Sequence, residues 1–597
     1  MIVSKTDPLE FHKSGYEKAT SQGKEFKRKQ TFIAWLRLFL FLIIPFGIWI
    51  IYHGNSAGYF LTAAGIISFL VAVRWYIKLE RSTREQMIIT RLHLQELAAI
   101  GDDITSFDAG LEFTDTKHPF SYDLDVFGRE SLFQHICRTV TLKGKTRLAE
   151  LLSDPVNSPE AIKARQEFVS SLASDPSFST EFRTAGKMNM AENSSLEGLE
   201  SWLKSAPGFL RHKWIRSASF FSPAIIILLL ILNATIGLST TWLWLPIGFN
   251  SLLLGRYLAE INKIHGDLST TSSLIAQLSG LLSVTGKYSF STIEFQQIKK
   301  DSADVSQSIN KLYKIFNTFD LRLNMIAGAV LNLFFLFDFH CLFSLKKWKS
   351  ENSGLLKKSL ENMESLDVYQ SLSMFAFHRP GNIYPEITAH NYEIIAENLA
   401  HPLIGETAVG NILSLGKDEQ LILLTGANMT GKSTWLRTIG LNCIVAYAGL
   451  PVSATKAVFP VLQLYTSMRI TDSLETGISY FRAELNRLKN MLDQLRQAKS
   501  NWLVLLDEPL RGTNSGDKQS GTIGLISNLL KLPATAIVAT HDAALCDLEI
   551  KHQGKISNYH FDSTISGLEL TFDYTLKRGC SVSNNATLLM KLTGILD

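Results

Sequence analysis

Two long runs without charged residues interrupt the otherwise mixed pattern of apolar and polar positions. The first extends from Leu38 to Val73 and the second from Ser217 to Gly255, which are 36 and 39 residues without Asp, Glu, Lys or Arg. Each run is too long for one membrane-spanning helix of about 20 residues. Each also has a polar break near its middle, at residues 53–56 in the first and 239–241 in the second. Each run therefore predicts a helical hairpin.

The charges beside the two runs give the orientation of the hairpins. Both runs have Lys and Arg on either side, whereas the two turns carry neither. These flanking cations are Lys27, Arg28, Lys29, Arg37, Arg74, Lys78, Arg81 and Arg84 for the first run, and Arg211, Lys213, Arg216, Arg256 and Lys263 for the second. By the positive-inside rule, both hairpins enter and leave the membrane on the cytoplasmic side. We predict a multi-pass protein of the inner (cytoplasmic) membrane, with hairpins at 32–78 and 217–258. Buried core helices are the alternative, which uncharged runs of this length disfavour.

The polar remainder of the chain divides by pattern. Residues 1–31 are Lys-rich without periodicity, and we expect them to be disordered or to lie on the anionic inner leaflet. Residues 79–120 read as an amphipathic connector, and 121–216 with 259–385 as one mostly helical domain. A short apolar stretch inside that domain, Met325 to Phe337, fits a buried core helix better than a span.

From about residue 386 to 597, short β-rich apolar runs alternate with helices, which predicts a parallel α/β domain. The net charge of +4 is close to neutral, so bulk charge does not indicate a strongly basic nucleic-acid binder. The 522 residues outside the two uncharged runs hold all 114 charged residues, or 22%, so the low overall charge of 19% is a local effect. The five cysteines are odd in number and include no CxxC pair, which predicts reduced, mostly buried thiols and neither a disulfide framework nor a zinc site.

A phosphate-binding loop lies in the α/β region. The apolar run Gln420 to Thr425 is followed by Gly426-Ala-Asn-Met-Thr-Gly-Lys-Ser433, which has the spacing GxxxxGK[ST]. Glycines let the backbone curl so that its N–H groups point at the β- and γ-phosphates of a nucleotide. Lys432 adds a positive charge, Ser433 offers a hydroxyl to Mg²⁺, and the helix that follows from Thr434 points its positive end at the phosphates.

Two further predicted strands end beside residues that can take part in nucleotide hydrolysis. The apolar strand Trp502 to Leu506 ends in Asp507, which can support Mg²⁺, and Glu508, which can orient and deprotonate an attacking water. A third strand ends at Thr540 and leads into His541, which could sense the γ-phosphate. A helix from Gly477 to Ala498 carries Ser479 in its first turn, where either a helix cap or an anion contact is possible.

Together these residues resemble the MutS family of DNA mismatch-repair ATPases. The resemblance lies in Thr425 to Thr434 with Asn428, in Asp507 to Asp517, in Thr540-His541, in His401-Pro402 with Asn411, in Ser479 with Phe481 and Glu484, and in the segment Ser583 to Gly594, which is similar to that family's dimerisation tail. Weaker resemblance to the family's core domain extends over Leu132-Phe133, Thr139 to Gly144, Pro155 and Ala164 to Val169.

The resemblance implies an α/β P-loop (ABC-type) ATPase domain beside an all-α core and lever domain, with ATP and Mg²⁺ as cofactors. It implies an ATP site formed by Gly426, Asn428, Met429, Thr430, Gly431, Lys432, Ser433 and Thr434, with Ser433 and Asp507 at the metal and Glu508 and His541 as catalytic residues. Ser479, Asn514 and Asp517 would act across a homodimer. DNA binding and mismatch repair are the implied biology; the resemblance names no protein partner.

The sequence also departs from that family. It contains no Phe-x-Glu, the wedge motif of mismatch-reading members, and a predicted hairpin at 217–258 occupies what looks like the position of the DNA clamp. Both departures argue against direct mismatch reading. We therefore expect a membrane-anchored ATPase whose dimer switches with ATP. A nucleotide-gated membrane scaffold that tethers DNA or a protein is the alternative, and a transporter-type ATPase is disfavoured because no Ser-Gly-Gly signature precedes Asp507 and the spans carry no charge.

Overall fold

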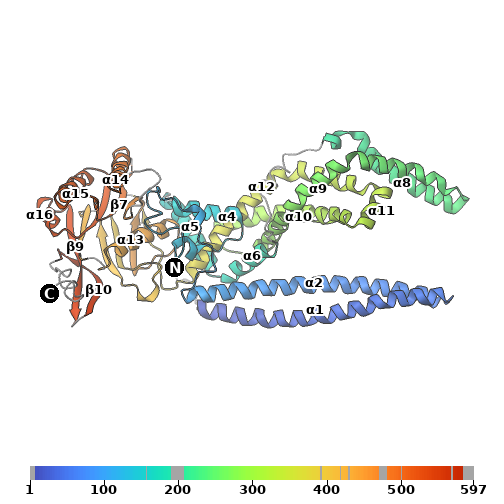
Figure 1. Ribbon diagram of the computed structural model, residues 1–597, viewed down its shortest axis with the longest axis horizontal. Helices are drawn as coiled ribbons and strands as arrows, with labels where there is room; N and C mark the ends of the chain where they lie inside the picture. The colour runs from blue at the N-terminus through green and yellow to red at the C-terminus, as the bar shows by residue number, and fades with distance from the viewer. Residues whose placement is uncertain are drawn as a thin grey trace. The chain divides into compact units, whose positions relative to one another are not determined.

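The computed structural model describes residues 7–155, 158–189, 208–389, 393–416, 418–427, 430–469, 480–498, 500–566 and 569–581. The chain divides into two compact units. One comprises Met1–Phe11, Gln95–Pro176 and Val368–Asp597, and the other His12–Leu94 and Ser177–Asp367. The first unit holds all the described strands, and the second consists of long helices (Figure 1).

A six-stranded sheet forms the centre of the first unit. Its strand order is β10-β9-β4-β8-β7-β6. The bounds are β4 Leu421–Thr425, β6 Gln463–Ser467, β7 Trp502–Asp507, β8 Ala534–Thr540, β9 Ile556–Ser566 and β10 Glu569–Arg578. Neighbouring strands are parallel except for the antiparallel pair β9 and β10. The predicted parallel α/β region is thus present.

Alternate residues of the central strands enter two different cores, because successive side chains of a strand point to opposite faces. Ile422 and Leu424 join a core that contains helix α13 (Lys432–Tyr447). Leu421 and Leu423 join one that contains α14 (Tyr480–Gln497) and α15 (Ser515–Leu529). Helices therefore cover both faces of the sheet, with α14 and α15 opposite α13 (Figure 1).

A second, four-stranded sheet and a group of short helices complete the first unit. The strand order is β1-β5-β2-β3, with bounds β1 Glu386–Thr388, β2 Ile394–Leu399, β3 Asn411–Leu415 and β5 Lys456–Pro460. The helices are α3 Leu132–Ile136, α4 Leu142–Ser153, α5 Pro159–Ala173 and α16 Leu548–Lys551. Side chains of α3, α4 and α5 share one hydrophobic core with α13, so part of the predicted helical domain packs directly on the α/β domain.

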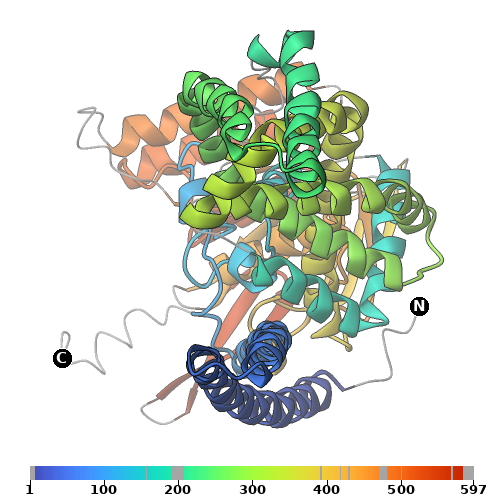
Figure 2. The ribbon, with the colours of Figure 1, turned by 90° about the vertical axis from the view of Figure 1, so that its right-hand side faces the viewer.

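In the second unit, α1 (Pro8–Tyr52) and α2 (Ala57–Ile100) form an antiparallel hairpin with a short turn, side by side in both ribbon views (Figures 1 and 2). The expectation of a disordered tail over 1–31 is wrong from Pro8 onward, because α1 already begins there. The reason is tertiary packing, which stabilises helices beyond their propensity. His12 of α1 shares a 2.9 Å hydrogen bond between Nδ1 atoms with His93 of α2.

The other helices of the second unit are α8 Lys213–Ile236, α9 Trp244–Lys287, α10 Ile293–Phe319 and α11 Met325–Phe335. The unit also contains most of α12 (Phe337–Phe377) and all of α6 (Pro176–Met188) except its first residue. Buried polar groups join three of them. Asn250 of α9 accepts a hydrogen bond from Ser222 of α8 over 2.6 Å and donates one to the Leu333 carbonyl of α11 over 2.7 Å. Helix α11 is not the buried core helix that its length suggested. Its polar and small residues Gly328 and Asn332 face inward, while Met325 and Ile326 are 84% and 75% exposed.

Three described helices are long and apolar enough to cross a membrane: Pro8–Tyr52, Ala57–Ile100 and Lys213–Ile236. A bent pair, Val305–Leu323 with Met325–Phe335, could make a fourth. Among the described residues, α9 does not meet the same criterion, although the second arm of the second predicted hairpin lies in its first half. Pro246, Asn250 and Arg256 lower the apolarity of that half.

The cysteine prediction is right for three residues and wrong for two. Cys137, Cys341 and Cys443 are buried and free, whereas Cys546 and Cys580 form a disulfide. The pairing follows from the fold. Asn558 of β9 donates a hydrogen bond to the Cys546 carbonyl, and its own carbonyl accepts one from Gly579, so the two cysteines are held beside the same residue although 34 positions separate them.

Candidate active site

The predicted chemical residues meet at one edge of the six-stranded sheet. Thr425 at the end of β4 pairs with Thr540 at the end of β8, and Asp507 at the end of β7 pairs with Ala539. Carboxyl ends of parallel strands share an edge, which is where α/β proteins of this kind bind ligands. The phosphate loop, Asp507-Glu508 and His541 are therefore brought together by strand register.

In the phosphate loop, the Lys432 side chain is hydrogen-bonded to backbone carbonyls of the same loop. Gly426 and Gly431 have φ values of 147° and 102°, which favour glycine, and α13 begins immediately afterwards at Lys432. The Lys432 ammonium donates hydrogen bonds to the carbonyls of Gly426 (2.6 Å) and Ala427 (2.7 Å). Burial lowers the pKa of Lys432, partly opposed by Glu508 and Asp507. A buried cation in a ring of backbone groups at a helix N-terminus is suited to bind an anion.

Ser433 and Asp507 bring two oxygen ligands together. The Ser433 hydroxyl donates a hydrogen bond to Asp507 Oδ2 over 2.6 Å, and Asp507 is almost completely buried. Hydroxyl and carboxylate oxygens form the donor set that Mg²⁺ prefers, usually together with water and substrate phosphates. The two residues therefore fit the predicted Mg²⁺ site. Among the described residues, no group of three or more His, Cys, Asp or Glu side chains forms an all-protein metal site.

Glu508 lies beside Asp507 in a left-handed backbone conformation, with φ 50°. Its carboxylate faces three cationic or titratable groups: His541 Nδ1 at 3.3 Å, Arg511 Nε at 3.5 Å and Lys518 Nζ at 4.0 Å. Burial raises the pKa of Glu508, but Arg511, His541 and Lys518 together outweigh burial and leave it below the usual value. Glu508 is thus held ionised, as a general base requires.

Arg511 connects both carboxylates. Its guanidinium lies 3.2 Å from Asp507 Oδ2 and also donates to the Asp507 carbonyl over 3.0 Å. No sequence motif marks a role for Arg511. In the fold, its positive charge lies beside both adjacent carboxylates.

Glu484 of α14 fixes the turn that carries Arg511. Its Oε1 accepts hydrogen bonds from the backbone N–H of Leu510 (2.6 Å) and Arg511 (3.4 Å). Burial raises the pKa of Glu484, although these backbone donors and the Arg511 charge lower it. Leu510 has a φ of 64°, which is unfavourable for a branched side chain, so the turn depends on outside support.

A cavity of about 440 Å³ opens beside the phosphate loop. It is lined by His401, Ile404, Thr407, Ala408, Val409, Asn411, Gly431, Thr434, Trp435, Thr438, Phe561 and Tyr574. Asn411 holds one wall, since its side chain donates to the Tyr574 carbonyl (3.0 Å) and accepts from Leu576 N–H (2.6 Å). Burial lowers the pKa of His401 to about 4, with Arg437 acting in the same direction. The lining is thus uncharged at neutral pH and includes the rings of Trp435, Phe561 and Tyr574.

The aromatic wall of this cavity was not foreseen. Tyr574 belongs to β10, where the register with β9 shifts between Phe572 and Leu576. This bulge gives Tyr574 a φ of 51° and places its ring against Gly431. No sequence motif marks the residue. The strand pattern around Tyr574 does not show where its side chain points, because that direction depends on the bulge, which is a tertiary feature.

The remaining predicted site residues fall into two groups. Asn428, Met429 and Ser479 lie outside the described residues, as does the predicted dimerisation tail. Thr430 and Thr434 lie in the loop and in the first turn of α13. Asn514 caps α15 by accepting from Asp517 N–H (2.9 Å) and donating to the Asp517 carboxylate (2.7 Å). Both side chains are thereby fixed at the start of a helix.

A buried aspartate joins the phosphate-binding half of the site to the helical segment before it. Asp123 accepts hydrogen bonds from Thr466 (2.7 Å) of β6 and Arg487 (2.9 Å) of α14. Close by, Asp125 forms ion pairs with Arg469, which follows β6, and with Arg437 of α13 at 3.3 Å. The loop at 121–126 is therefore tied by charge to three elements of the α/β domain.

The fold and the site define an α/β domain of the P-loop nucleotide-binding class: strand, glycine loop with Lys-Ser, helix, and an Asp-Glu pair on a neighbouring strand end. Residues 422–595 match the family model of MutS domain V, which is the ATPase domain of that family.

The chain is also similar to named relatives. It is 31% identical over 235 residues to a DNA mismatch repair protein MutS of Aquifex pyrophilus, with 38% of this chain and 27% of the relative covered. It is 32% identical over 261 residues to that of Clostridium botulinum (strain Okra / Type B1), covering 42% and 27%, and 31% identical over 231 residues to that of Geobacillus sp. (strain WCH70), covering 38% and 26%. The match spans only about a quarter of these relatives' length. It supports a MutS-type ATPase domain in this chain.

Proposed function

We propose that this chain is a Mg²⁺-dependent ATPase of the MutS type, anchored to a membrane, in which ATP drives a dimer between two conformations. The observation that carries the enzymatic part is the meeting of Lys432, Ser433, Asp507, Glu508 and His541 at one sheet edge, next to a cavity of about 440 Å³. The matching MutS domain V supports ATP as the nucleotide.

The phosphates of the nucleotide bind at the loop, and its nucleoside binds in the cavity. The β- and γ-phosphates take the place of the Gly426 and Ala427 carbonyls at the Lys432 ammonium, because charged acceptors form stronger hydrogen bonds than neutral ones. The nucleoside extends over Gly431 and Thr434 into the aromatic cavity, where Tyr574 offers a ring for stacking. A neutral His401 avoids placing a buried charge beside the base.

Ser433 and Asp507 would hold Mg²⁺, which when bound neutralises charge on the phosphate oxygens. Glu508 accepts a proton from the attacking water, and its lowered pKa keeps it ionised for that step. His541 bonds to Glu508 on the side away from Arg511 and orients it. Arg511 balances the two carboxylates before substrate binds and stabilises negative charge on the phosphates afterwards.

The direct test is Glu508→Gln, which keeps the shape of the side chain and removes the base. The variant should bind ATP with unchanged affinity and hydrolyse it about 10²- to 10⁴-fold more slowly, accumulating as an ATP-bound dimer. Single-turnover hydrolysis and light scattering measure the two effects. A normal hydrolysis rate would show that another group activates the water.

The ion pairs of Asp123 and Asp125 would couple ATP binding at the phosphate loop to movement of the helical segment. Arg437 sits on the helix that begins at the phosphate loop, and Arg469 leads into the segment that carries Ser479. In the dimer, Ser479 together with Asn514 and Asp517 would meet the partner's nucleotide. Closure would then shift the 121–126 loop and the helices that follow it.

Membrane anchoring rests on the exposed apolar surface of α1, α2, α8 and α11. In α8, for example, Phe221 and Ile231 are 68% and 53% exposed, while its buried side includes the polar Ser222. A helix that is apolar outside and polar inside suits a lipid environment. Single cysteines at Gly54 and Gly237, with the exposed Gly554 as a cytoplasmic reference, test the topology. The first two should react with an impermeant maleimide only from the outer side of the inner membrane.

DNA binding enters the proposal through the names of the similar proteins. The similar proteins are named for DNA mismatch repair, but the match covers only about a quarter of their length. Binding to matched and mismatched duplexes at several salt concentrations decides the matter. Preference for the mismatch would support repair recognition. Salt-dependent binding without preference would support the nucleotide-gated membrane scaffold.

A further inference from the structure

The hairpin of α1 and α2 contains a large cavity far along the sequence from the ATP site. It has a volume of about 890 Å³ and is lined by Glu25, Phe26, Arg28, Lys29, Phe32 and Ile33 of α1, and by Trp75, Lys78, Leu79 and Ser82 of α2. All ten lining residues belong to the same compact unit. The cavity combines an apolar wall with three cations and one carboxylate, a net charge of +2.

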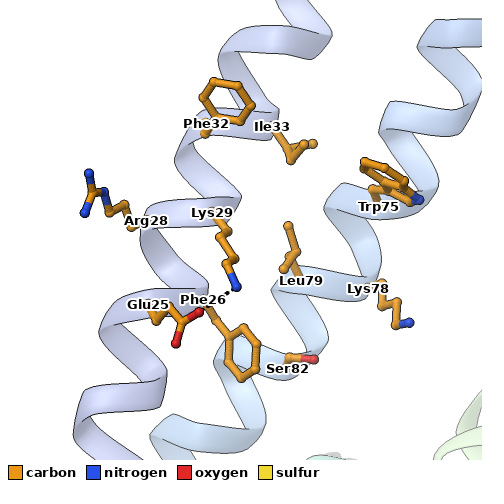
Figure 3. Close-up of a pocket in the computed structure, with 10 residues that line it drawn as sticks. All are labelled: Glu25, Phe26, Arg28, Lys29, Phe32, Ile33, Trp75, Lys78, Leu79 and Ser82. Atoms are coloured by element: carbon orange, nitrogen blue, oxygen red, sulfur yellow. Dashed lines mark hydrogen bonds and ion pairs between the residues drawn. The ribbon is translucent and has the colours of Figure 1, made fainter.

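Most of the apolar groups and the Lys29–Glu25 pair lie toward opposite ends of the cavity. Phe32, Ile33 and Trp75 lie at one end, nearer the uncharged run, while Glu25, the Lys29 ammonium and Ser82 lie toward the other, together with the ring of Phe26 (Figure 3). Lys29 and Ile33 of α1 and Leu79 of α2 point into the space between the helices, whereas Arg28 and Lys78 project outward on its two sides. Ile33 is 6% exposed, but Phe32 and Trp75 are 67% and 60% exposed. An amphipathic ligand with an apolar chain and an anionic head matches this order.

The position of the cavity along the hairpin axis agrees with an amphipathic ligand of this kind. Lys29 lies three residues before Phe32, which is about 4.5 Å of helix rise. Lys78 likewise follows Trp75 by three residues. Trp side chains favour the boundary between hydrocarbon and headgroups, and lysines snorkel toward the headgroup layer. With the membrane anchoring proposed above, the apolar end of the cavity is at the edge of the hydrocarbon and the cationic end is among the phosphates.

We propose that this cavity binds one anionic phospholipid on the cytoplasmic leaflet. Its acyl chain lies against Ile33, Leu79 and Trp75, and its phosphate is bound by Lys29, with Ser82 at the same end and Lys78 at the rim of the cavity. Lys29 now pairs with Glu25 over 2.6 Å, and both side chains are more than half exposed. The phosphate replaces that carboxylate, and Arg28 adds long-range attraction. A net charge of +2 selects an anionic over a zwitterionic headgroup.

The test uses the full-length protein in nanodiscs and the fluorescence of Trp75. Phosphatidylcholine discs receive increasing fractions of phosphatidylglycerol that carries bromine on its acyl chains, and a parallel series receives brominated phosphatidylcholine. The Trp75→Phe variant is subtracted, because nine other tryptophans also emit. We expect half-maximal quenching of Trp75 at a brominated phosphatidylglycerol fraction at least threefold lower than for brominated phosphatidylcholine.

Two double variants assign that preference to the cavity. Lys29→Gln with Lys78→Gln should abolish it, whereas Arg211→Gln with Lys213→Gln removes the same charge beside the other predicted hairpin and should retain it. Equal quenching by both lipids, or equal loss in both variants, overturns the lipid site while leaving membrane anchoring intact. Absence of quenching by either lipid places the hairpin outside the bilayer and overturns the anchoring as well.

Discussion

The Ser433 hydroxyl and the Asp507 carboxylate are joined by a 2.6 Å hydrogen bond across 74 residues of sequence. This contact brings the last residue of the GKS motif to the end of a strand two positions away in the sheet. Ser433→Ala removes one oxygen from the proposed Mg²⁺ site. The Mg²⁺ concentration for half-maximal ATPase activity should rise about 10- to 100-fold, with partial recovery at high Mg²⁺. Ser433→Thr keeps the hydroxyl and should stay close to the wild type. Equal Mg²⁺ dependence in all three proteins would remove Ser433 from the metal site.

Arg511 controls the ionisation of Glu508, so its removal should change the pH profile. Burial raises the pKa of Glu508, and Arg511 is the first of the groups that lower it. Arg511→Gln therefore raises this pKa. Because the base works only when ionised, the acid limb of kcat/KM moves to higher pH. Arg482→Gln makes the same charge change at an exposed position of α14 and should leave the limb in place. A limb that does not move in Arg511→Gln would show that another group sets it.

Tyr574 should contribute to nucleotide affinity through its ring. Tyr574→Ala opens the cavity wall and should weaken ATP binding by about 1–3 kcal/mol, the usual value for a base stacked on an aromatic side chain. Tyr574→Phe keeps the ring and should retain most of the affinity. Isothermal titration with a nonhydrolysable ATP analogue measures both. If triphosphate alone loses as much affinity as ATP in Tyr574→Ala, the residue supports the loop and not the base.

Glu484 should matter for stability through the turn at 510–511. Glu484→Ala leaves the Leu510 and Arg511 N–H groups without their acceptor and should lower the free energy of unfolding by about 1–3 kcal/mol. Glu484→Gln keeps an acceptor oxygen in the same place and should cost less. Urea unfolding of the two variants gives the comparison. Equal losses in the two variants would mean that the charge and not the acceptor alone is needed.

The Cys546–Cys580 disulfide gives a redox prediction. It closes a loop with a sequence separation of 34, for which loop entropy gives a stabilisation of about 4 kcal/mol at most. Oxidised protein should therefore unfold at higher denaturant concentration than reduced protein, and Cys580→Ser should abolish the difference. Thiols of a domain in a reducing cytoplasm stay reduced. Rapid alkylation in cells followed by peptide mapping should then find both thiols free, and a cellular disulfide would contradict the proposed cytoplasmic location.

Several features could be predicted from the sequence alone because their cause is local. The phosphate loop follows from fixed spacing of glycines, Lys432 and Ser433. Strand ends at Asp507 and Thr540 follow from short apolar runs, and the shared edge follows from parallel pairing. The two uncharged runs mark helices because their apolar length exceeds that of ordinary core segments. For these, neighbouring residues in the chain carry enough information.

Other features were decided only by the tertiary structure, because they depend on side chains far apart in sequence. The helix at Pro8 forms where α2 supplies a packing partner, although its own sequence lacks periodicity. Helix α11 turns Gly328 toward the backbone of Arg322 and Asn332 toward the backbone N–H of Asp338. A register shift against β9 aims Tyr574 at Gly431, and Asn558 brings Cys546 and Cys580 together. Local pattern fixes which element forms, whereas long-range packing and register decide which faces and side chains meet.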